Sequence, residues 1–88
     1  MIKFRDQVNA LMSITVKYFA VLRERYGKSG DSVPFEIGMT VSDVWKRALA
    51  VEAIPDNLMI AVNMEYTRKD TQLKDGDEVA FFPAVTGG

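Results

Sequence analysis

The sequence predicts a small α+β roll, in which a mixed sheet of four to five strands packs on one main helix. Three observations support this fold class. Short segments alternate apolar and polar residues as half-buried strands do, one longer segment has the apolar spacing of an amphipathic helix, and turn-forming glycine, aspartate and proline separate them. With 88 residues, the chain is sized for a single domain with one hydrophobic core.

The first strand is expected at residues 13–19. Ile14, Val16 and Tyr18 fall on one face of this segment and Phe19 falls on the other, because successive side chains of a strand point to opposite faces. The first three residues are therefore expected in the core, and Phe19 is expected outside it.

A short helix should follow from Ala20. Leu22 and Tyr26 lie four residues apart on one helical face, and Gly27 suits the left-handed position just past a helix end. A turn over residues 28–31 then leads to the next strand.

A second strand is expected at residues 32–37, where Val33, Phe35 and Ile37 alternate toward the core. Pro34 lacks the N–H that a central strand donates, so this strand is expected at a sheet edge. The first two strands should pair as a hairpin across the short helix.

The main helix is expected from residue 41 to about residue 53. Thr40 can cap its N-terminus, Asp43 completes an imperfect capping box, and Pro55 should stop the helix. Its apolar residues recur at the spacing of one helical face: Val41, Val44, Trp45, Ala48 and Leu49. This face is expected to cover one side of the sheet.

Three further strands complete the expected sheet. Residues 58–62 form a continuous apolar run, short enough for a central strand, and residues 66–67 are expected to form a stub of another strand. The turn residues 75–77 precede the last strand, at residues 78–82, which Pro83 closes.

Composition excludes several classes of function. The chain has no cysteine and no histidine, so it cannot form a disulfide, a Cys/His zinc site or a Cys-His or Ser-His catalytic couple. Eleven basic against twelve acidic side chains give a net charge of -1, which argues against nucleic acid as a partner. Asp75 and Asp77 lack the further ligands of a calcium loop, so no metal site is expected.

The N-terminus and the hydropathy of the chain indicate a cytoplasmic protein. Residues 1–6 are charged and lack the apolar stretch of a secretory signal. No segment approaches the roughly 20 apolar residues of a membrane helix, so we expect no membrane association. Residues 1–11 are expected to be a frayed extension, and residues 12–82 the folded domain.

Residues 83–88 are expected to form a flexible tail that ends in Gly87 and Gly88. Because glycine has no Cβ, such a tail is a thin stalk that can enter a channel closed to larger side chains. The terminal carboxylate of Gly88 is therefore the leading candidate for the functional group.

Residues 73–88, with the sequence LKDGDEVAFFPAVTGG, resemble the C-terminus of the small, sulfur-carrying subunits of molybdopterin synthase, a ubiquitin-like β-grasp family. The resemblance extends more loosely over residues 13–88. Two departures are the extension at residues 1–11 and Ala84, where many members carry a second proline. The resemblance implies a ubiquitin-like β-grasp fold for the roll.

The resemblance also implies a carrier rather than an enzyme that acts alone. In this family an adenylyltransferase that resembles ubiquitin-activating enzymes uses ATP to convert the terminal glycine, here Gly88, to an acyl adenylate, and sulfur then replaces AMP. The product is a thiocarboxylate at the C-terminus. The large catalytic subunit uses this thiocarboxylate to insert sulfur into precursor Z (cyclic pyranopterin monophosphate), which gives the molybdopterin dithiolene. The two subunits are expected to form a two-plus-two heterotetramer. Val85, Thr86 and Gly87 would form the tail, and the carrier itself is expected to hold no cofactor.

An exposed patch of Phe19, Tyr66 and Phe82, with Pro83 beside it, is the expected anchor for the large subunit. Strand parity places Phe19 and Phe82 outside the core, and these positions match the hydrophobic contact surface of family members. A bulge that shifts the register would instead place both phenylalanines in the core.

Two other functions stay open from the sequence. A sulfur carrier for thiamine synthesis would share the fold and the terminal glycines, although the aromatic-proline block at residues 81–83 favours the pterin pathway. A ubiquitin-like conjugation or interaction module would instead link its terminal glycine to lysines of other proteins.

Overall fold

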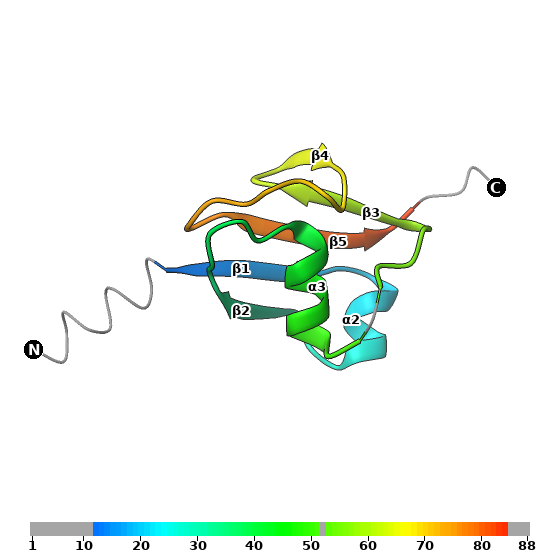
Figure 1. The fold of residues 1–88 in the computed structure, drawn as a ribbon. Helices are drawn as coiled ribbons and strands as arrows, with labels where there is room; N and C mark the ends of the chain where they lie inside the picture. The colour runs from blue at the N-terminus through cyan, green and yellow to red at the C-terminus, as the bar shows by residue number, and fades with distance from the viewer. Residues whose placement is uncertain (1–11, 52, 85–88) are drawn as a thin grey trace, which may run out of the picture.

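The structure, a computed structural model, describes residues 12–51 and 53–84. In chain order its elements are β1 (Ser13–Tyr18), α2 (Val21–Tyr26), β2 (Gly30–Pro34), α3 (Val41–Leu49), β3 (Leu58–Val62), β4 (Glu65–Thr67) and β5 (Glu78–Pro83). The strands form one mixed sheet in the order β2-β1-β5-β3-β4 (Figure 1). β1 and β5 pair in parallel at the centre, and the other neighbours pair antiparallel. The predicted α+β roll is therefore confirmed.

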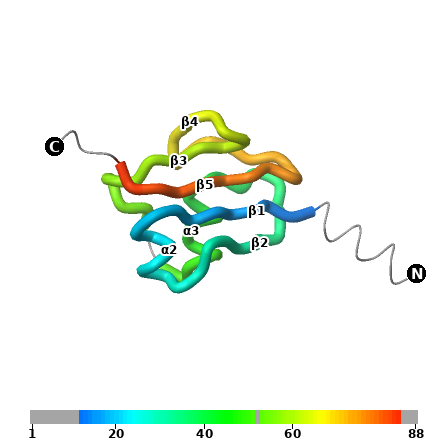
Figure 2. The backbone as a smooth tube through the Cα atoms, turned by 180° about the vertical axis from the view of Figure 1, so that it is seen from behind, coloured from blue at the N-terminus to red at the C-terminus, as the bar shows by residue number. Residues whose placement is uncertain are grey.

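α3 covers one face of the sheet and leaves the other face open. In Figure 1 this helix lies in front of the strands, and in Figure 2, which views the molecule from behind, the strands lie in front of the helix. The predicted alternation along β1 is confirmed, because Ile14, Val16 and Tyr18 are buried in the core on the side of α3. The short helix α2 is also confirmed, and Gly27 just past its end has a left-handed φ of 70°.

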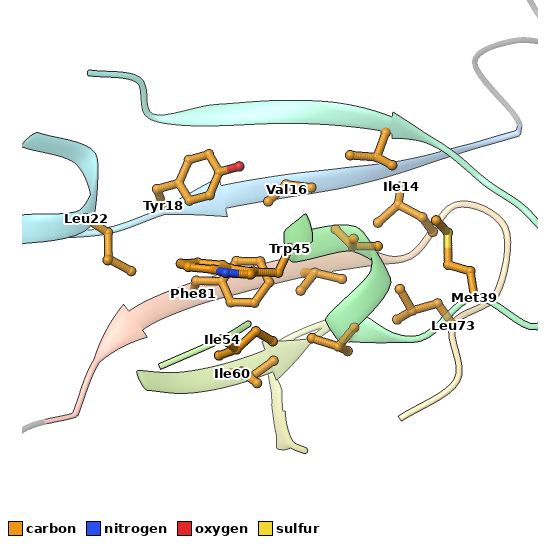
Figure 3. Packing of buried hydrophobic residues seen from close by; sticks show 14 residues of the cluster. Ile14, Val16, Tyr18, Leu22, Met39, Trp45, Ile54, Ile60, Leu73 and Phe81 are labelled. Atoms are coloured by element: carbon orange, nitrogen blue, oxygen red, sulfur yellow. The ribbon is translucent and has the colours of Figure 1, made fainter. Parts of the chain in front are cut away.

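Aromatic side chains from both layers meet in the core (Figure 3). The Trp45 indole of α3 packs on the Phe81 ring of β5 with ring centroids 4.8 Å apart. The indole also meets the Tyr26 ring of α2 edge-on. Phe81 also stacks with Tyr18 of β1 at 6.3 Å. Each such pair adds roughly 0.5–1.5 kcal/mol beyond the area it buries, so this cluster is a main source of stability.

The hydroxyl of Tyr18 connects the core to a polar network. It donates a hydrogen bond to the Asp31 carboxylate at 2.9 Å, and the Lys28 ammonium lies 2.7 Å from the same carboxylate. Lys28 also donates to the Ala48 carbonyl in the last turn of α3 at 3.4 Å. Burial, and then the hydrogen bond to Asp31, raise the pKa of Tyr18, so the phenol stays neutral at physiological pH.

α3 ends at Leu49. The prediction that this helix extends to about residue 53 is therefore wrong. Ala50 takes a left-handed backbone with a φ of 55°, and the chain turns back toward the sheet. This return buries Ile54 in the core and lets the Ala53 carbonyl accept a hydrogen bond from Trp45 Nε1 at 3.2 Å. Tertiary packing therefore overrides the local helical pattern.

β2 covers Gly30–Pro34 rather than residues 32–37. The predicted burial of Ile37 is wrong, since its side chain is 95% exposed. After the strand, the Met39 N–H donates to the Glu36 carbonyl and closes a turn, so that Met39 takes the buried position instead. The predicted pairing with β1 and the position at a sheet edge are confirmed.

The remaining strands follow the predictions with small differences. β3 has the predicted bounds, and β4 is a three-residue strand at the predicted place. β5 continues one residue past its predicted end, because Pro83 pairs with Leu58 of β3. The Ala84 N–H then donates to the Asn57 carbonyl at 3.0 Å. Backbone pairing thus reaches beyond residue 83, where the tail was expected to start.

A tight turn of Asn63 and Met64 joins β3 to β4. Both residues have a positive φ, 51° and 71°, as in the type I′ turns that suit hairpins. The Asn63 side chain donates to the Asp77 carboxylate at 2.8 Å and accepts from the Glu78 N–H at 3.0 Å. The asparagine therefore fixes the hairpin tip against the start of β5, while the Met64 side chain is 91% exposed.

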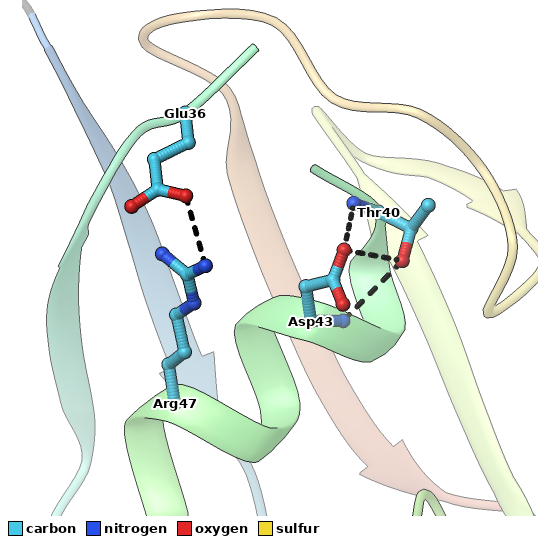
Figure 4. Close-up of polar contacts among 4 residues, drawn as sticks. All are labelled: Glu36, Thr40, Asp43 and Arg47. Atoms are coloured by element: carbon cyan, nitrogen blue, oxygen red, sulfur yellow. Dashed lines mark hydrogen bonds and ion pairs between the residues drawn. The ribbon is translucent and has the colours of Figure 1, made fainter. Parts of the chain in front are cut away.

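A capping box fixes the start of α3 (Figure 4). The Asp43 carboxylate accepts from the Thr40 N–H at 2.9 Å and from the Thr40 hydroxyl at 3.2 Å, and the Asp43 N–H donates to Thr40 Oγ1 at 3.3 Å. The predicted capping box is confirmed. The backbone hydrogen bond from Thr40 is the main cause of a lowered pKa of Asp43. Beside it, Arg47 pairs with Glu36 at 2.9 Å and lowers the pKa of Glu36.

We expect the pH dependence of stability to report this cap. Asp43→Ala should lower the free energy of unfolding by about 1 kcal/mol at neutral pH. Because the folded-state pKa of Asp43 is lowered, the carboxylate stabilises the fold above its unfolded pKa, and this contribution is lost as pH falls through the folded pKa. Urea unfolding at neutral pH and at successively lower pH should therefore show the variant and the wild type converging.

Asp75→Ala is the matched control for this experiment, because the Asp75 side chain makes no hydrogen bond or ion pair with the residues that the structure describes. The control should cost less than Asp43→Ala. An equal loss at both positions, or a difference at Asp43 that stays constant on acidification, would contradict the assigned cap.

Candidate functional site

Three aromatic side chains meet on the open face of the sheet. Phe19 lies just past β1, Phe82 lies on β5 and Tyr66 lies on β4. The Phe19 and Phe82 rings meet edge-on with centroids 6.3 Å apart, and the Tyr66 ring lies 5.9 Å from that of Phe82. Phe19 is 44% exposed, Tyr66 is 72% exposed and Phe82 is half-buried. These three residues are called the aromatic patch, and their predicted clustering outside the core is confirmed.

The register of the sheet explains why the aromatic patch forms. Phe82 follows the buried Phe81 in β5, so its side chain points to the opposite face. The parallel pairing of Tyr18 with Phe81 brings the next residue of each chain segment, Phe19 and Phe82, side by side on the open face. The alternative in which a bulge places both phenylalanines in the core is therefore excluded.

Sequence reasoning missed the smaller side chains that complete this surface. Met59 of β3 pairs with Phe82, and Ala61 of β3 lies between Ala80 and Tyr66. Because β3 is apolar throughout, its sequence does not show which of its residues face the aromatic patch. Only the pairing with β5 assigns Met59 and Ala61 to the open face, where Ala61 is buried among its larger neighbours.

The backbone at Ala20 sets the position of Phe19. The Phe19 N–H donates to the Phe81 carbonyl at 3.1 Å, and the Leu22 N–H donates to the Phe19 carbonyl at 3.2 Å. The second bond closes a turn in which Ala20 has φ 56° and ψ -130°. This is the first central position of a type II′ turn, which glycine adopts freely and alanine only with strain. A strained turn thus lies next to the aromatic patch.

β5 leads directly from the aromatic patch to the end of the described chain. Phe82 is followed by Pro83, the last residue of the strand, and by Ala84, which is held through its backbone N–H. The predicted tail residues, Val85, Thr86, Gly87 and Gly88, lie outside the described residues. Their roles, and the contact of Pro83 with a partner, stay predictions.

The side chains around the aromatic patch are suited to binding another protein. On the open face the Lys17 ammonium lies 3.1 Å from the Glu78 carboxylate. Within residues 12–51 and 53–84, no group of three acidic side chains is placed to hold a metal ion. Exposed aromatic clusters of this kind are typical of surfaces that bind another protein.

Over the part of the chain that the structure describes, no helix is long and apolar enough to cross a membrane.

Residues 16–88 match the sequence model of the ThiS family. The molybdopterin synthase sulfur carrier subunit of Escherichia coli (strain K12) is 40% identical over 84 residues, which cover 85% of this chain and 99% of that protein. The subunit of the same name from Chlamydomonas reinhardtii is 36% identical over 83 residues, which cover 88% of this chain and 100% of that protein.

Among solved structures, SAMP1 from Haloferax volcanii, a small archaeal modifier protein, is similar to this chain with a TM-score of 0.73 and 27% sequence identity. The match covers 86% of this chain and 99% of SAMP1. This similarity confirms the ubiquitin-like β-grasp fold.

We expect Ala20→Gly to raise the free energy of unfolding by about 1 kcal/mol, because relief of the strained backbone outweighs the entropy that glycine adds to the unfolded chain. Urea unfolding measures the change. Ala53→Gly is the control, since Ala53 is not among the residues with positive φ, and it should lower stability slightly. A loss of stability at both positions would show that Ala20 is not strained.

Proposed function

Because this chain belongs to the ThiS family, we propose that it is the sulfur carrier subunit of a molybdopterin synthase. Its relatives of that name match it over nearly their whole length. The observation that carries the proposal is the continuity of β5, which supplies Phe82 to the aromatic patch and leads through Pro83 to Ala84. A partner that binds the aromatic patch would therefore fix the point from which the terminal residues start.

In the proposed reaction the C-terminal carboxylate of Gly88 carries the sulfur. A carboxylate is a poor electrophile, so one of its oxygens first attacks the α-phosphate of ATP, which releases pyrophosphate and leaves an acyl adenylate. Hydrosulfide released by the sulfur donor then attacks the acyl carbon, AMP leaves with the carboxylate oxygen, and the proton on the new sulfur is lost to water. The product is a thiocarboxylate at the end of the backbone, which suits a chain that has no cysteine to carry sulfur.

Partner proteins would perform both the loading of sulfur onto Gly88 and its later transfer. An adenylyltransferase that resembles ubiquitin-activating enzymes would charge the carrier. The large subunit would then receive the tail, Val85 to Gly88, and transfer sulfur to cyclic pyranopterin monophosphate within a two-plus-two heterotetramer. The carrier alone would bind no cofactor and catalyse no reaction.

The aromatic patch is suited to supply the affinity that insertion of the tail requires. Fixing the backbone of the four residues after Ala84 in a channel costs on the order of 4–8 kcal/mol. Burying a large apolar side chain contributes roughly 1.5–3 kcal/mol. Because Phe19 and Phe82 are already partly buried in the free chain, the three rings of the aromatic patch offset part of this cost, and further contacts with the large subunit must offset the rest.

The similarity to SAMP1 supports a second candidate, a ubiquitin-like module whose terminal glycine becomes amide-linked to lysines. Both candidates need the same fold and terminus, and they differ in what replaces AMP. Branched Gly-Gly remnants on target lysines, without a thiocarboxylate, would favour the module. Co-purification with a thiamine-pathway enzyme instead of a molybdopterin synthase large subunit would favour the thiamine carrier.

We expect the purified chain, incubated with its adenylyltransferase, ATP and a sulfur donor, to exchange one oxygen for sulfur at Gly88. Intact mass spectrometry measures the exchange, and fragmentation should assign the new mass to the C-terminal peptide. A variant with one alanine added after Gly88 is the control, because its terminus is no longer glycine. Failure to charge the wild type, or equal charging of the extended variant, would contradict the proposal.

We also expect Phe82→Ala to weaken binding of the molybdopterin synthase large subunit by about tenfold or more, because a central aromatic side chain is lost from the contact. Tyr66→Ala should weaken it as well, and this exposed ring can be removed with little effect on folding. Calorimetric titration measures both affinities.

Ile37→Ala is the matched control for these variants, since it removes an exposed apolar side chain outside the aromatic patch. Unchanged affinity in both patch variants, or an equal loss in the control, would place the contact elsewhere on the molecule.

A further inference from the structure

A hollow of about 370 Å³ lies beside Phe19 on the open face of the sheet. Its walls come from three elements and include Lys17 of β1, Arg23 of α2 and Ser29, Gly30 and Asp31 at the start of β2. Phe19 lines the hollow and also belongs to the aromatic patch. The hollow and the aromatic patch therefore form one continuous surface.

Gly30, which also lines the hollow, lets β1 and β2 approach closely. Gly30 pairs with Lys17 across the β1–β2 ladder, and a Cβ at this position would lie 2.7 Å from the Val16 carbonyl oxygen. That contact is too short for any side chain without movement of the two strands. The close approach of β1 and β2 thus requires a glycine at this position beside the hollow.

Among the described residues, the charges around the hollow leave one cation without a partner. Lys17 is paired with Glu78 at 3.1 Å, and Asp31 is paired with Lys28 at 2.7 Å. The Arg23 guanidinium makes no ion pair or side-chain hydrogen bond with any residue in the ranges 12–51 and 53–84. The hollow therefore offers an uncompensated positive charge next to an exposed phenylalanine.

We infer that this hollow receives an acidic side chain of the large subunit, whose carboxylate binds the Arg23 guanidinium. The inference rests on the proposed function, because it assumes that the large subunit covers the aromatic patch. A protein seated on Phe19 must also cover the hollow that Phe19 lines. An uncompensated arginine at a covered site is unfavourable unless it is paired, and a carboxylate matches the planar donor fork of a guanidinium.

The ion pair would fix the orientation of the large subunit on this chain. Apolar contacts between rings and a partner surface are only weakly directional, so the aromatic patch alone leaves the partner free to rotate about it. A charge-assisted contact at Arg23, on α2, fixes a second point to one side of Phe82. Two fixed points set the orientation in which the end of β5 faces the partner's active site.

The test compares Arg23→Glu with Arg25→Glu. Both residues lie on α2 and are exposed, both substitutions change the net charge equally, and Arg25 does not line the hollow. Surface plasmon resonance against the immobilised large subunit should show at least about a tenfold loss of affinity for Arg23→Glu, with a weaker salt dependence than that of the wild type. Arg25→Glu should stay within about twofold of the wild type, and Arg23→Lys should fall between the two.

Phe82→Ala separates failure of this inference from failure of the proposed function. If Phe82→Ala weakens binding while Arg23→Glu and Arg25→Glu behave alike, the ion pair is wrong and the carrier function stands. If the wild-type chain does not bind the large subunit, both are wrong. Thermal unfolding of each variant checks the fold, and a loss of affinity in a folded Arg23→Glu supports the ion pair.

Discussion

The parallel pairing of β1 with β5 at the centre of the sheet is the constraint on which the rest of the structure depends. It places Tyr18 against Phe81 inside, where both rings join Trp45. Because side chains alternate along strands, the same register places Phe19 against Phe82 outside. The pairing of β1 with β5 therefore sets both the core and the aromatic patch. A shift of its register by one residue would exchange the side chains of the two faces.

The sequence predicts well those features that depend on local periodicity. Alternation along β1 and β5 is enough to separate Phe19 and Phe82 from the core, and the cap at Thr40 is readable from two residue types. The end of α3 is different, because it depends on the burial of Ile54, which lies beyond the helix. Within the described part of the chain, Arg23 has no ionic partner because the nearby charges pair with one another across the fold, and no short motif encodes such an arrangement.

Turn residues on two sides fix the position of the aromatic patch. Asn63 binds Asp77, just before β5, and Glu78, the first residue of β5, and so fixes the β3–β4 hairpin on which Tyr66 lies. Ala20 has a strained backbone, which lets α2 begin at Val21, two residues after Phe19, and places Arg23 beside the hollow. The strained backbone of Ala20 therefore borders the surface proposed for binding, as is common where function sets the geometry.

The exposure of Met64 affects how the sulfur-loaded carrier can be detected by mass spectrometry. Its thioether is open to oxidants at the hairpin tip, and conversion to the sulfoxide adds one oxygen, about 16 Da. Replacing oxygen by sulfur in a terminal acyl group also adds about 16 Da, so an unfragmented spectrum does not separate the two products chemically. Met12 is also 51% exposed, so a Met64→Leu background would remove only part of this ambiguity. Treatment with a methionine sulfoxide reductase would act on both side chains, because it restores the thioether and leaves the acyl sulfur in place.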